Sequence, residues 1–362
     1  MHADWEALAT ANGQAPVFLR PQWFEIGSRL GVITPWSLLV IQAEQRLIGL
    51  LVLHRRTPWT ADTCEFLSMN NPPVLIDPLY EEAAWAGFTK WFQQQSHCHM
   101  LSLGRWHVNE RLTSVMETVH ANGIHPSRKA LVPDHWLPLP NSWDAYLAGI
   151  GKATRYNLRR REAQLHRDFG DVTVEIVADP AGFTREAEAF FAIHHRRWRH
   201  EQTDSFRIPA VRQFYREVMD WTLGEGSAAM LILRVQGQAV TMATVFHTPG
   251  QHAAHFHVIA RDPDALPRKY SPGIVVLSHL IRYAIDHGAQ HLIMGHGSDY
   301  YKTLLGAEEY ALCELYAART PTEYAVFSKL DPLMHIIRHL PRTLSRRVYS
   351  IRQSLHRKTT QE

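Results

Sequence analysis

The sequence contains few cysteines. Three occur in 362 residues, odd in number and far apart (Cys64, Cys98 and Cys313). This pattern excludes a disulfide framework and a zinc ribbon, and it is typical of reduced thiols in a cytoplasm. With 45% hydrophobic and 20% charged residues, the composition also excludes wholesale disorder. A length of 362 residues is enough for two globular domains.

Long apolar runs are absent as well. The longest candidate, Ser37 to Leu53, is interrupted by Glu44 and Arg46, whereas a helix that spans a bilayer needs roughly 20 apolar residues. The chain begins Met-His-Ala-Asp-Trp-Glu, without the basic and apolar segments of a secretory signal. Together with the reduced cysteines, these features predict a cytoplasmic protein.

Most of the chain lacks an excess of positive charge. The formal net charge is +3, yet the segment from Asp331 to Glu362 alone holds seven basic and two acidic residues. The rest of the chain is therefore slightly acidic, which is not typical of a nucleic-acid-binding surface, and we expect no DNA partner.

The basic segment has its own pattern. Apolar residues recur there at spacings of three and four with the arginines largely off that stripe, although Pro341 interrupts it. This predicts a basic amphipathic helix within residues 326–362. We expect it to pack on the protein or on a twin subunit. The alternative is peripheral contact with the anionic inner face of a membrane.

An internal repeat organises the remaining residues. Residues 38–53 and 230–245 each predict a strand, a tight polar turn and a second strand, and they align without a gap at a shift of 192 residues. The same shift places residues 99–103 on residues 291–295. Two matches at one shift predict tandem copies of one α/β domain.

The domain boundary is predicted in a stretch with four prolines (Pro126, Pro133, Pro138 and Pro140). The copies then cover residues 1–135 and 136–325. In the second copy, spacing predicts a helix from Asp144 to about Leu165 and another from Phe183 to Trp198. Later elements are expected as strands over 230–234, 239–247 and 253–260, a helix from Pro272 to about His287, and a strand over 290–294.

A local motif in the second copy predicts an anion site. Arg268 to Ile274 reads Arg-Lys-Tyr-Ser-Pro-Gly-Ile and lies between a strand and a helix. Ser271 is a strong N-cap residue, Pro272 suits the first helical position, and Gly273 lets a ligand approach the backbone. Free amides at a helix start, beside basic side chains, predict a phosphate pocket. The alternative is a plain Ser-Pro helix start.

The first copy differs at the aligned position. There the sequence is Ile-Asp-Pro-Leu-Tyr-Glu-Glu over residues 76–82, with carboxylates where an anion would lie. We therefore expect the first copy to be degenerate and unable to bind phosphate.

Several short motifs occur in one order along the second copy, between Trp143 and Gly306: Trp143–Leu147, the basic segment Lys152–Arg161, His194–Trp198, the turn at Gln236–Gly237, Tyr270–Gly273, Gly295–Gly297 and Tyr301–Lys302. In this combination the second copy resembles the GNAT acyltransferase superfamily, specifically its CelD-type, BioF-like acetyltransferase branch, which is related to FemAB-type peptidyltransferases. The usual loop of the family is Arg/Gln-x-x-Gly-x-Gly/Ala, whereas this chain has Ser-Pro-Gly. The resemblance implies a mixed, mostly antiparallel central sheet flanked by helices.

The resemblance also implies a reaction. An acyl group would pass directly from acetyl-CoA or another acyl-CoA, as co-substrate, to an amine acceptor such as an amino sugar or an envelope polysaccharide precursor. In GNAT folds the loop after the fourth strand holds the donor pyrophosphate. Here that loop supplies Arg268, Lys269, Tyr270, Ser271, Gly273 and Ile274.

The chemistry needs an acid for the leaving thiolate and a base for the amine. Tyr301 is the first candidate for the acid, and Lys302 either stabilises negative charge or is a solvated surface residue. Asp299, His194 and His257 are candidate bases. His194 shares a face with apolar residues and is also typical of a core histidine, and Asp299 is also typical of a helix cap.

Basic residues suggest where substrate binds. The candidates are Arg155, Arg159, Arg197, Trp198 and His257, which could contact a phosphate-rich donor or a nucleotide-linked sugar. A solvated surface is the alternative for the charged ones. We expect no metal, because the histidine pairs His255/His257 and His97/His99 lack further ligands at an informative spacing.

Two other functions remain open from the sequence. One is a FemAB-like transferase that uses aminoacyl-tRNA, which would account for the basic helix through backbone contacts. The other is a non-catalytic protein that binds an anion or a membrane surface.

Overall fold

A computed structural model describes residues 1–11, 15–33, 36–55, 60–63, 74–96, 98–199, 204–248, 250, 252–297 and 299–339. Cys64, His97 and most of the basic segment after Asp331 lie outside what it describes; of residues 331–339 the backbone alone is described. In the part that is described, no helix is both long enough and apolar enough to cross a membrane.

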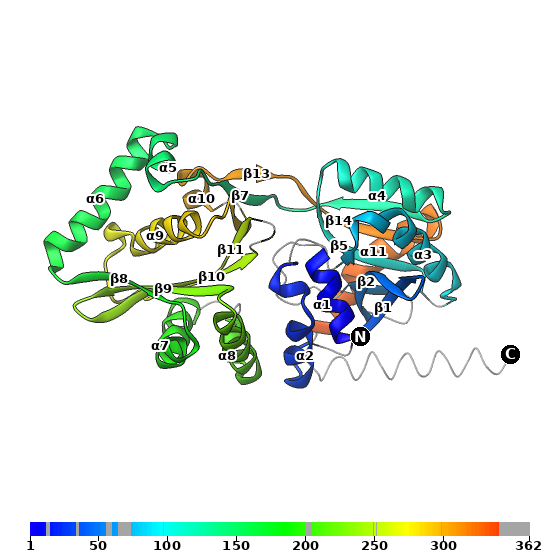
Figure 1. Cartoon of the computed structure of the whole chain (residues 1–362), viewed down its shortest axis with the longest axis horizontal. Coiled ribbons are helices and arrows are strands. Elements are labelled where there is room, and N and C mark those ends of the chain that lie inside the picture. Colours follow the sequence, from blue (N-terminus) through cyan, green and yellow to red (C-terminus); the bar gives the residue numbers. More distant parts are fainter. Residues whose placement is uncertain are drawn as a thin grey trace.

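The chain forms two sheets that lie side by side, each with its own helices (Figure 1). The elements up to the domain boundary are α1 (His2–Ala11), η1 (Val17–Leu19), α2 (Pro21–Arg29), β1 (Trp36–Ala43), β2 (Arg46–Arg55), β3 (Thr60–Thr63), β4 (Val74–Ile76), η2 (Pro78–Tyr80), α3 (Glu81–Gln94), β5 (Met100–His107), α4 (Glu110–Ala121) and β6 (His125–Ala130).

The second half begins with the strand β7 and ends with the helix α11. Its elements are β7 (Asp134–Pro138), α5 (Trp143–Gly149), α6 (Lys152–Phe169), β8 (Val172–Val177), α7 (Pro180–Trp198), η3 (Ser205–Arg207), α8 (Pro209–Gly224), β9 (Ala228–Val235), β10 (Gln238–Thr248), β11 (Ala253–Arg261), η5 (Arg268–Tyr270), α9 (Pro272–Asp286), β12 (His291–His296), α10 (Tyr300–Leu304), β13 (Glu308–Tyr310), β14 (Leu312–Ala318) and α11 (Pro321–His339).

The two sheets exchange one strand each. The first has the order β1-β2-β3-β5-β14-β6, with β4 paired to β2, and the second has the order β13-β7-β12-β11-β10-β9-β8. β14, the last strand in sequence, lies between β5 and β6 of the first sheet, whereas β7, which directly follows β6 in sequence, lies between β12 and β13 of the second. This exchange joins the two domains through main-chain hydrogen bonds.

The tandem α/β architecture predicted from the repeat is confirmed. The order β1-β2-β3-β5-β14-β6 in the first sheet corresponds to β9-β10-β11-β12-β7-β13 in the second, with β8 added outside β9. Both hairpin turns have two residues with positive φ, namely Glu44 and Gln45 in the first and Gln236 and Gly237 in the second. Positive φ at both central residues is the geometry that matches the twist of an antiparallel hairpin.

The prediction of one continuous helix at the start of the second copy is wrong. The helix is broken into α5 and α6, because Ile150 and Gly151 are extended, with ψ of 155° and 144°. The strand β8 and the helix α8 were not predicted at all. Leu147, Leu158 and Leu165 are nevertheless buried, as the spacing required.

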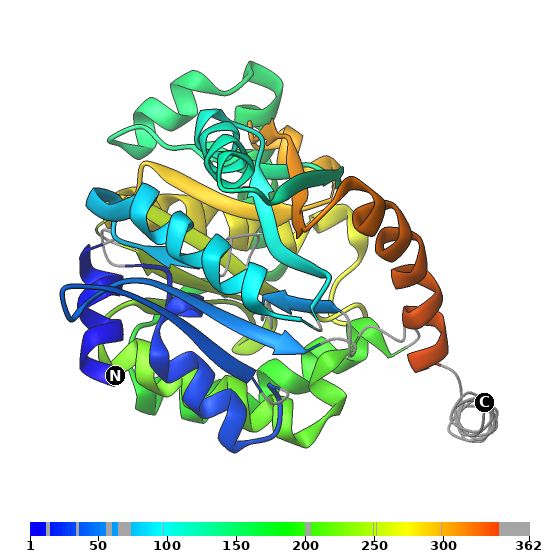
Figure 2. The same cartoon turned by 90° about the vertical axis from the view of Figure 1, so that its right-hand side faces the viewer.

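The N-terminal segment packs into the second domain. Phe18 of η1 and Trp23 and Phe24 of α2 share one hydrophobic core with Phe190 of α7 and Phe214 of α8. This core covers one face of the second sheet, and a separate core under α9 covers the other. In the first domain, α3 and α4 cover one face of the sheet, with α11 against its strands β5, β6 and β14 (Figure 2).

Candidate active site

Two parallel strands of the second sheet diverge. β11 and β12 pair only at three positions, where Ala253, Ala254 and His255 face His291, Leu292 and Ile293. β11 then continues to Arg261, paired with β10 on one side and, within the described residues, with no strand on the side of β12. A ligand can therefore pair with the main-chain groups on that side as a strand would.

A cavity of about 290 Å³ lies along the unpaired part of β11. Its lining is contributed by the end of β11, η5, the start of α9 and α10: Ile259, Arg261, Arg268, Ser271, Pro272, Gly273, Ile274, Leu277 and Tyr301. The walls are therefore largely aliphatic, with two guanidinium groups and one phenol. Such a cavity suits an elongated ligand that has an apolar arm and an anionic end.

The start of α9 differs from the anion site predicted from the sequence. Ser271 occupies the N-cap, but its φ is 49° and its side chain makes no cap hydrogen bond. Its carbonyl accepts from the N–H groups of Ile274 and Val275 at 2.9 and 3.4 Å. Among the described residues, nothing accepts from the N–H of Gly273. The helix start thus offers one free amide rather than several, in a left-handed backbone strained for serine.

Two arginines supply the positive charge of the cavity. Arg261 ends β11 and Arg268 begins η5, and no described residue accepts a hydrogen bond from either side chain. Burial lowers the pKa of the Arg261 guanidinium, and Arg197 and Arg268 lower it further. Asp262 opposes this effect. The guanidinium groups of three arginines thus lie close together, which favours an anion between them. Arg261 was not predicted, although a basic residue at the end of the strand before the loop was a usable signal.

Tyr301 and Lys302 lie at the other side of the cavity in different roles. Tyr301 lines it, and burial together with Asp299 raises the pKa of its phenol. Lys302 is 2% exposed, and its ammonium donates to the carbonyls of Gly295, His296 and Gly297 at 2.8, 2.8 and 3.0 Å. All three N–H groups are engaged, so Lys302 holds the backbone at the end of β12 and is not a solvated surface residue.

The comparison with known families agrees with this geometry. The model of an acetyltransferase (GNAT) domain matches residues 152–303, which run from α6 to α10 and include every residue that lines the cavity. The second domain belongs to the GNAT superfamily. No curated protein matches the chain.

Solved structures resemble the chain over most of its length, with low sequence identity. FemX has a TM-score of 0.61 at 10% identity and covers 88% of this chain and 95% of that one. The C-terminal domain of a putative lysylphosphatidylglycerol synthetase from Agrobacterium fabrum has a TM-score of 0.55 at 12% identity, with 85% and 94% covered. L-PGS from Bacillus licheniformis has a TM-score of 0.55 at 11% identity, with 87% and 96% covered. These likenesses show a shared two-domain fold.

Within the GNAT domain, the residues predicted to bind the acyl donor fall into two groups. Arg268, Ser271, Gly273 and Ile274 line the cavity. Tyr270 does not, because it is buried and its hydroxyl donates to Asp168 at 2.9 Å. Lys269 is exposed, with its ammonium 4.9 Å from the ring of Tyr270. Tyr270 therefore anchors η5 to α6, and Lys269 lies outside the cavity.

The three candidate bases have different surroundings. Asp299 is exposed and makes no cap hydrogen bond, and a carboxylate oxygen lies 3.8 Å from the ammonium of Lys302. His194 is buried, with Nδ1 3.1 Å from the carboxylate of Asp204, and burial lowers its pKa although Asp204 opposes this. His194 thus has the contacts of a core histidine. His257 lies on the diverging part of β11 and is partly exposed.

The predicted substrate-binding residues lie at two places. On α6, Arg155 donates to the carbonyl of Leu147 at 3.0 Å and joins the two helices, whereas Arg159 is exposed. At the end of α7, the guanidinium of Arg197 lies 4.4 Å from the ring centre of Trp198. Because Arg197 also affects the pKa of Arg261, the end of α7 is near the cavity.

The first domain lacks the equivalent charges. Asp77 is 2% exposed, accepts from Arg46 at 2.6 Å and caps η2 through the N–H of Leu79. Glu81, at the start of α3, accepts from Arg111 at 3.1 Å. Carboxylates therefore occupy the helix start where the GNAT domain has its cavity. Among the described residues there is also no cluster of three or more side chains suited to a metal ion.

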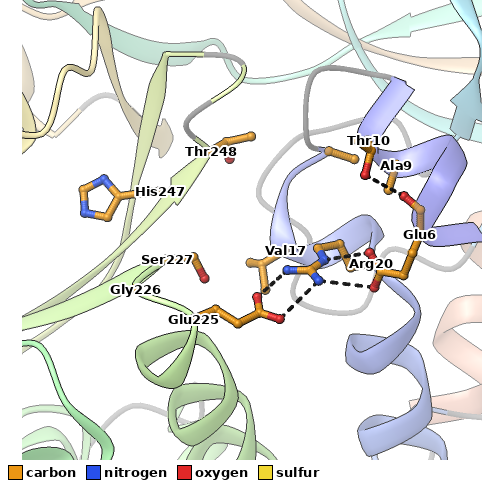
Figure 3. A pocket seen from close by; sticks show the side chains of 11 residues that line it. Glu6, Ala9, Thr10, Val17, Arg20, Glu225, Gly226, Ser227, His247 and Thr248 are labelled. Carbon is orange, nitrogen blue, oxygen red and sulfur yellow. Dashed lines mark hydrogen bonds and ion pairs between the residues drawn. The ribbon is translucent and has the colours of Figure 1, made fainter. Parts of the chain in front are cut away.

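A second cavity of about 350 Å³ lies between the N-terminal segment and the second domain (Figure 3). Arg20 lines it and donates to Glu225 at 2.5 Å and to Glu6 at 3.2 Å. This cavity adjoins Thr248, at one end of β10. Thr241, near the other end of β10, faces Arg261, which lines the first cavity. Since its arginine is already paired and it lies at the far end of the sheet, this cavity is separate from the GNAT site.

Proposed function

We propose that the protein is an N-acyltransferase that moves an acyl group, with acetyl as the expected group, from acyl-CoA to an amine. The observation that carries this proposal is the cavity along the unpaired edge of β11. Its aliphatic walls suit the narrow arm of the donor, and Arg261 and Arg268 suit the phosphates at its end.

The proposed reaction is a direct transfer. The lone pair of the amine attacks the thioester carbonyl carbon, a C–N bond forms, and the C–S bond breaks. The leaving thiolate takes the phenolic proton of Tyr301, whose raised pKa keeps the phenol protonated at neutral pH. The proton lost by the amine passes to His257, and both side chains regain their starting states through water.

The proposed acceptor is an amino sugar or an envelope polysaccharide precursor, and it approaches from the face of the sheet covered by α7 and α8. His257 is on that face, in contact with Tyr215 of α8. Trp198 and Arg197, at the end of α7, offer an aromatic face beside a cation. This combination suits a sugar that carries a phosphate.

A FemAB-like transferase that uses aminoacyl-tRNA is the second candidate, and the position of α6 favours it. This helix carries Lys152, Arg155, Arg159, Arg160 and Arg161, and it lies beside η5 and α9 (Figure 1). A donor with a long phosphate backbone could extend from the cavity along α6. The fold of FemX is also similar to this one.

The two donors are distinguished by product analysis. Purified protein is incubated with acetyl-CoA and a panel of amines that includes glucosamine and nucleotide-linked amino sugars, and in parallel with charged tRNA. We expect an N-acetylated amine by mass spectrometry, with one free CoA thiol per product. The Gly273→Asp variant should form none, since its carboxylate faces the donor phosphates. Product from charged tRNA alone would contradict the acyl-CoA proposal and support the second candidate.

A further inference from the structure

His257 occupies an irregular position on β11. Thr244 of β10 faces Val258, but the next residue, Val245, faces Phe256, so His257 is the extra residue of a β-bulge. A bulge redirects a side chain out of the regular alternation of the strand. His257 is consequently directed to the same side as Val258, where the aromatic side chains of α8 and η1 lie.

Aromatic rings enclose His257 from both domains. The ring of Tyr215 is stacked at 5.6 Å with an interplanar angle of 10°, and Phe18 is stacked at 6.3 Å and 26°. Phe246 lies at 5.0 Å and 59°. Phe18 belongs to η1, in the N-terminal segment, so the imidazole of the GNAT domain is held partly by residues outside that domain.

A chain of hydrogen bonds leads from the imidazole into the core. Nδ1 of His257 lies 3.4 Å from the hydroxyl of Tyr215, and that hydroxyl lies 2.6 Å from Oγ1 of Thr244. Oγ1 of Thr244 accepts from the N–H of Val258 at 3.3 Å and donates to its carbonyl at 3.5 Å. The bond to His257 is long, as contacts of catalytic groups often are before substrate binds.

One direction of donation satisfies all four contacts. Thr244 has a single proton, and the carbonyl of Val258 can only accept it, so Thr244 must accept from Tyr215. Tyr215 then has no proton for His257, and its oxygen accepts from Nδ1–H. With Nδ1 protonated, a neutral imidazole carries its lone pair on Nε2. No described residue bonds to that nitrogen, and the ring is partly exposed.

The neighbouring histidine provides a contrast. His255 is 1% exposed, and both of its ring nitrogens are buried without a partner. It therefore has neither a group that selects a tautomer nor access to a ligand. Burial, with a smaller effect of His255, lowers the pKa of His257 to about 3, so its imidazole is neutral at physiological pH.

We propose that Tyr215 and Thr244 are positioning residues that hold His257 in its Nδ1–H tautomer, with Nε2 presented to the acyl acceptor. This inference rests on the acyl transfer proposed above. As the C–N bond forms, the amine nitrogen becomes positively charged and far more acidic than a free ammonium. Nε2 then takes one proton from that nitrogen, and the electron pair of the broken C–S bond leaves on sulfur. The chain to Thr244 fixes the direction of the lone pair.

The tautomer can be read directly by NMR in the full-length protein with ¹⁵N-labelled histidine. The correlations of the ring protons with the two ring nitrogens distinguish the tautomers, and loss of a signal in His257→Gln assigns His257. We expect the Nδ1–H tautomer in the wild type and in Thr244→Ser, which keeps the hydroxyl. Tyr215→Phe and Thr244→Val preserve the packing volume but break the chain, and they should shift His257 toward the other tautomer.

Kinetics test the consequence for the reaction. Tyr215→Phe and Thr244→Val should lower kcat about 10- to 100-fold, as expected for a misdirected catalytic group, with an unchanged KM for the donor and near-normal activity in Thr244→Ser. A wild-type Nε2–H tautomer, or one unchanged by Tyr215→Phe, would overturn the inference. Absence of transfer by the wild type would overturn the proposed function, while the NMR result would still decide the role of Tyr215 and Thr244.

Discussion

Acidification should destabilise the protein through three histidines on β10 and β11, one fully buried and two partly exposed. Burial is the first cause of the lowered pKa in each, to about 4 for His247 and His255 and to about 3 for His257, against an ordinary value of 6.5. The folded state therefore stays unprotonated at these rings below pH 6.5, where the unfolded chain takes up protons. The contribution of these three rings to the free energy of unfolding is fully present above about pH 7 and is lost as the pH falls toward 4.

The magnitude follows from the shift. Between pH 7.5 and 5.5, each ring with such a shift lowers the free energy of unfolding by roughly 1.3 kcal/mol. Because His247 and His257 are partly exposed, the three together should remove about 3 kcal/mol. Urea unfolding followed by tryptophan fluorescence at the two pH values measures this difference.

Single variants assign the effect. His255 is the most completely buried of the three rings, and its nitrogens have no partners. His255→Leu should therefore retain or raise stability at pH 7.5 and reduce the loss at pH 5.5 by roughly 1.3 kcal/mol. His120→Leu, at an exposed position of α4, serves as the matched control and should leave the loss unchanged. Equal losses in the wild type and in His255→Leu would refute the reasoning.

Three further substitutions test other parts of the structure. Phe18→Ala should lower the free energy of unfolding by about 3–5 kcal/mol, because the ring is fully buried in the core shared with the second domain; an effect near zero in urea unfolding would contradict that core. Lys302→Met should lower the free energy of unfolding by about 3 kcal/mol, because three carbonyls lose their donor at roughly 1 kcal/mol each. Urea unfolding measures this loss. Tyr301→Phe should lower kcat about 100-fold with an unchanged KM for the donor in steady-state kinetics; full activity would exclude Tyr301 as the acid.

Local features of the fold were predictable from the sequence. The two hairpins were predicted because runs of apolar residues flank short polar turns, and these turns adopt the positive φ angles that such hairpins need. Pro272 correctly marks the start of α9, because proline suits the first position of a helix. These signals depend only on residues near one another in the chain.

Other features depend on contacts between distant residues. Nothing local to β14 shows that it lies between β5 and β6, since its sequence would suit either sheet. The packing of Phe18 against His257 likewise joins residues 239 positions apart. Hydropathy patterns report the burial of a segment but not the partner that buries it.

Only part of the candidate site was predicted from the sequence, because some of its residues come together through contacts between distant segments. The loop from Arg268 to Ile274 has its own signals, whereas Arg261 enters the cavity because β11 diverges from β12. Lys302 was expected to stabilise charge or to lie on the surface, but it is buried and donates to three carbonyls at the end of β12. A lysine in such a position has no sequence signature, because its partners are main-chain atoms.

Donor binding at the start of α9 can be measured by calorimetric titration of CoA and acetyl-CoA into wild-type protein, Gly273→Ala and Gly273→Asp. A Cβ at residue 273 would lie 3.6 Å from Ile259, an ordinary contact, so the alanine control should fold and bind. Aspartate in the first turn of a helix favours folding, but its charge opposes an anionic donor. The account predicts binding to the wild type and to Gly273→Ala, with at least a tenfold loss in Gly273→Asp. No binding to the wild type, or equal affinity in all three proteins, would contradict it.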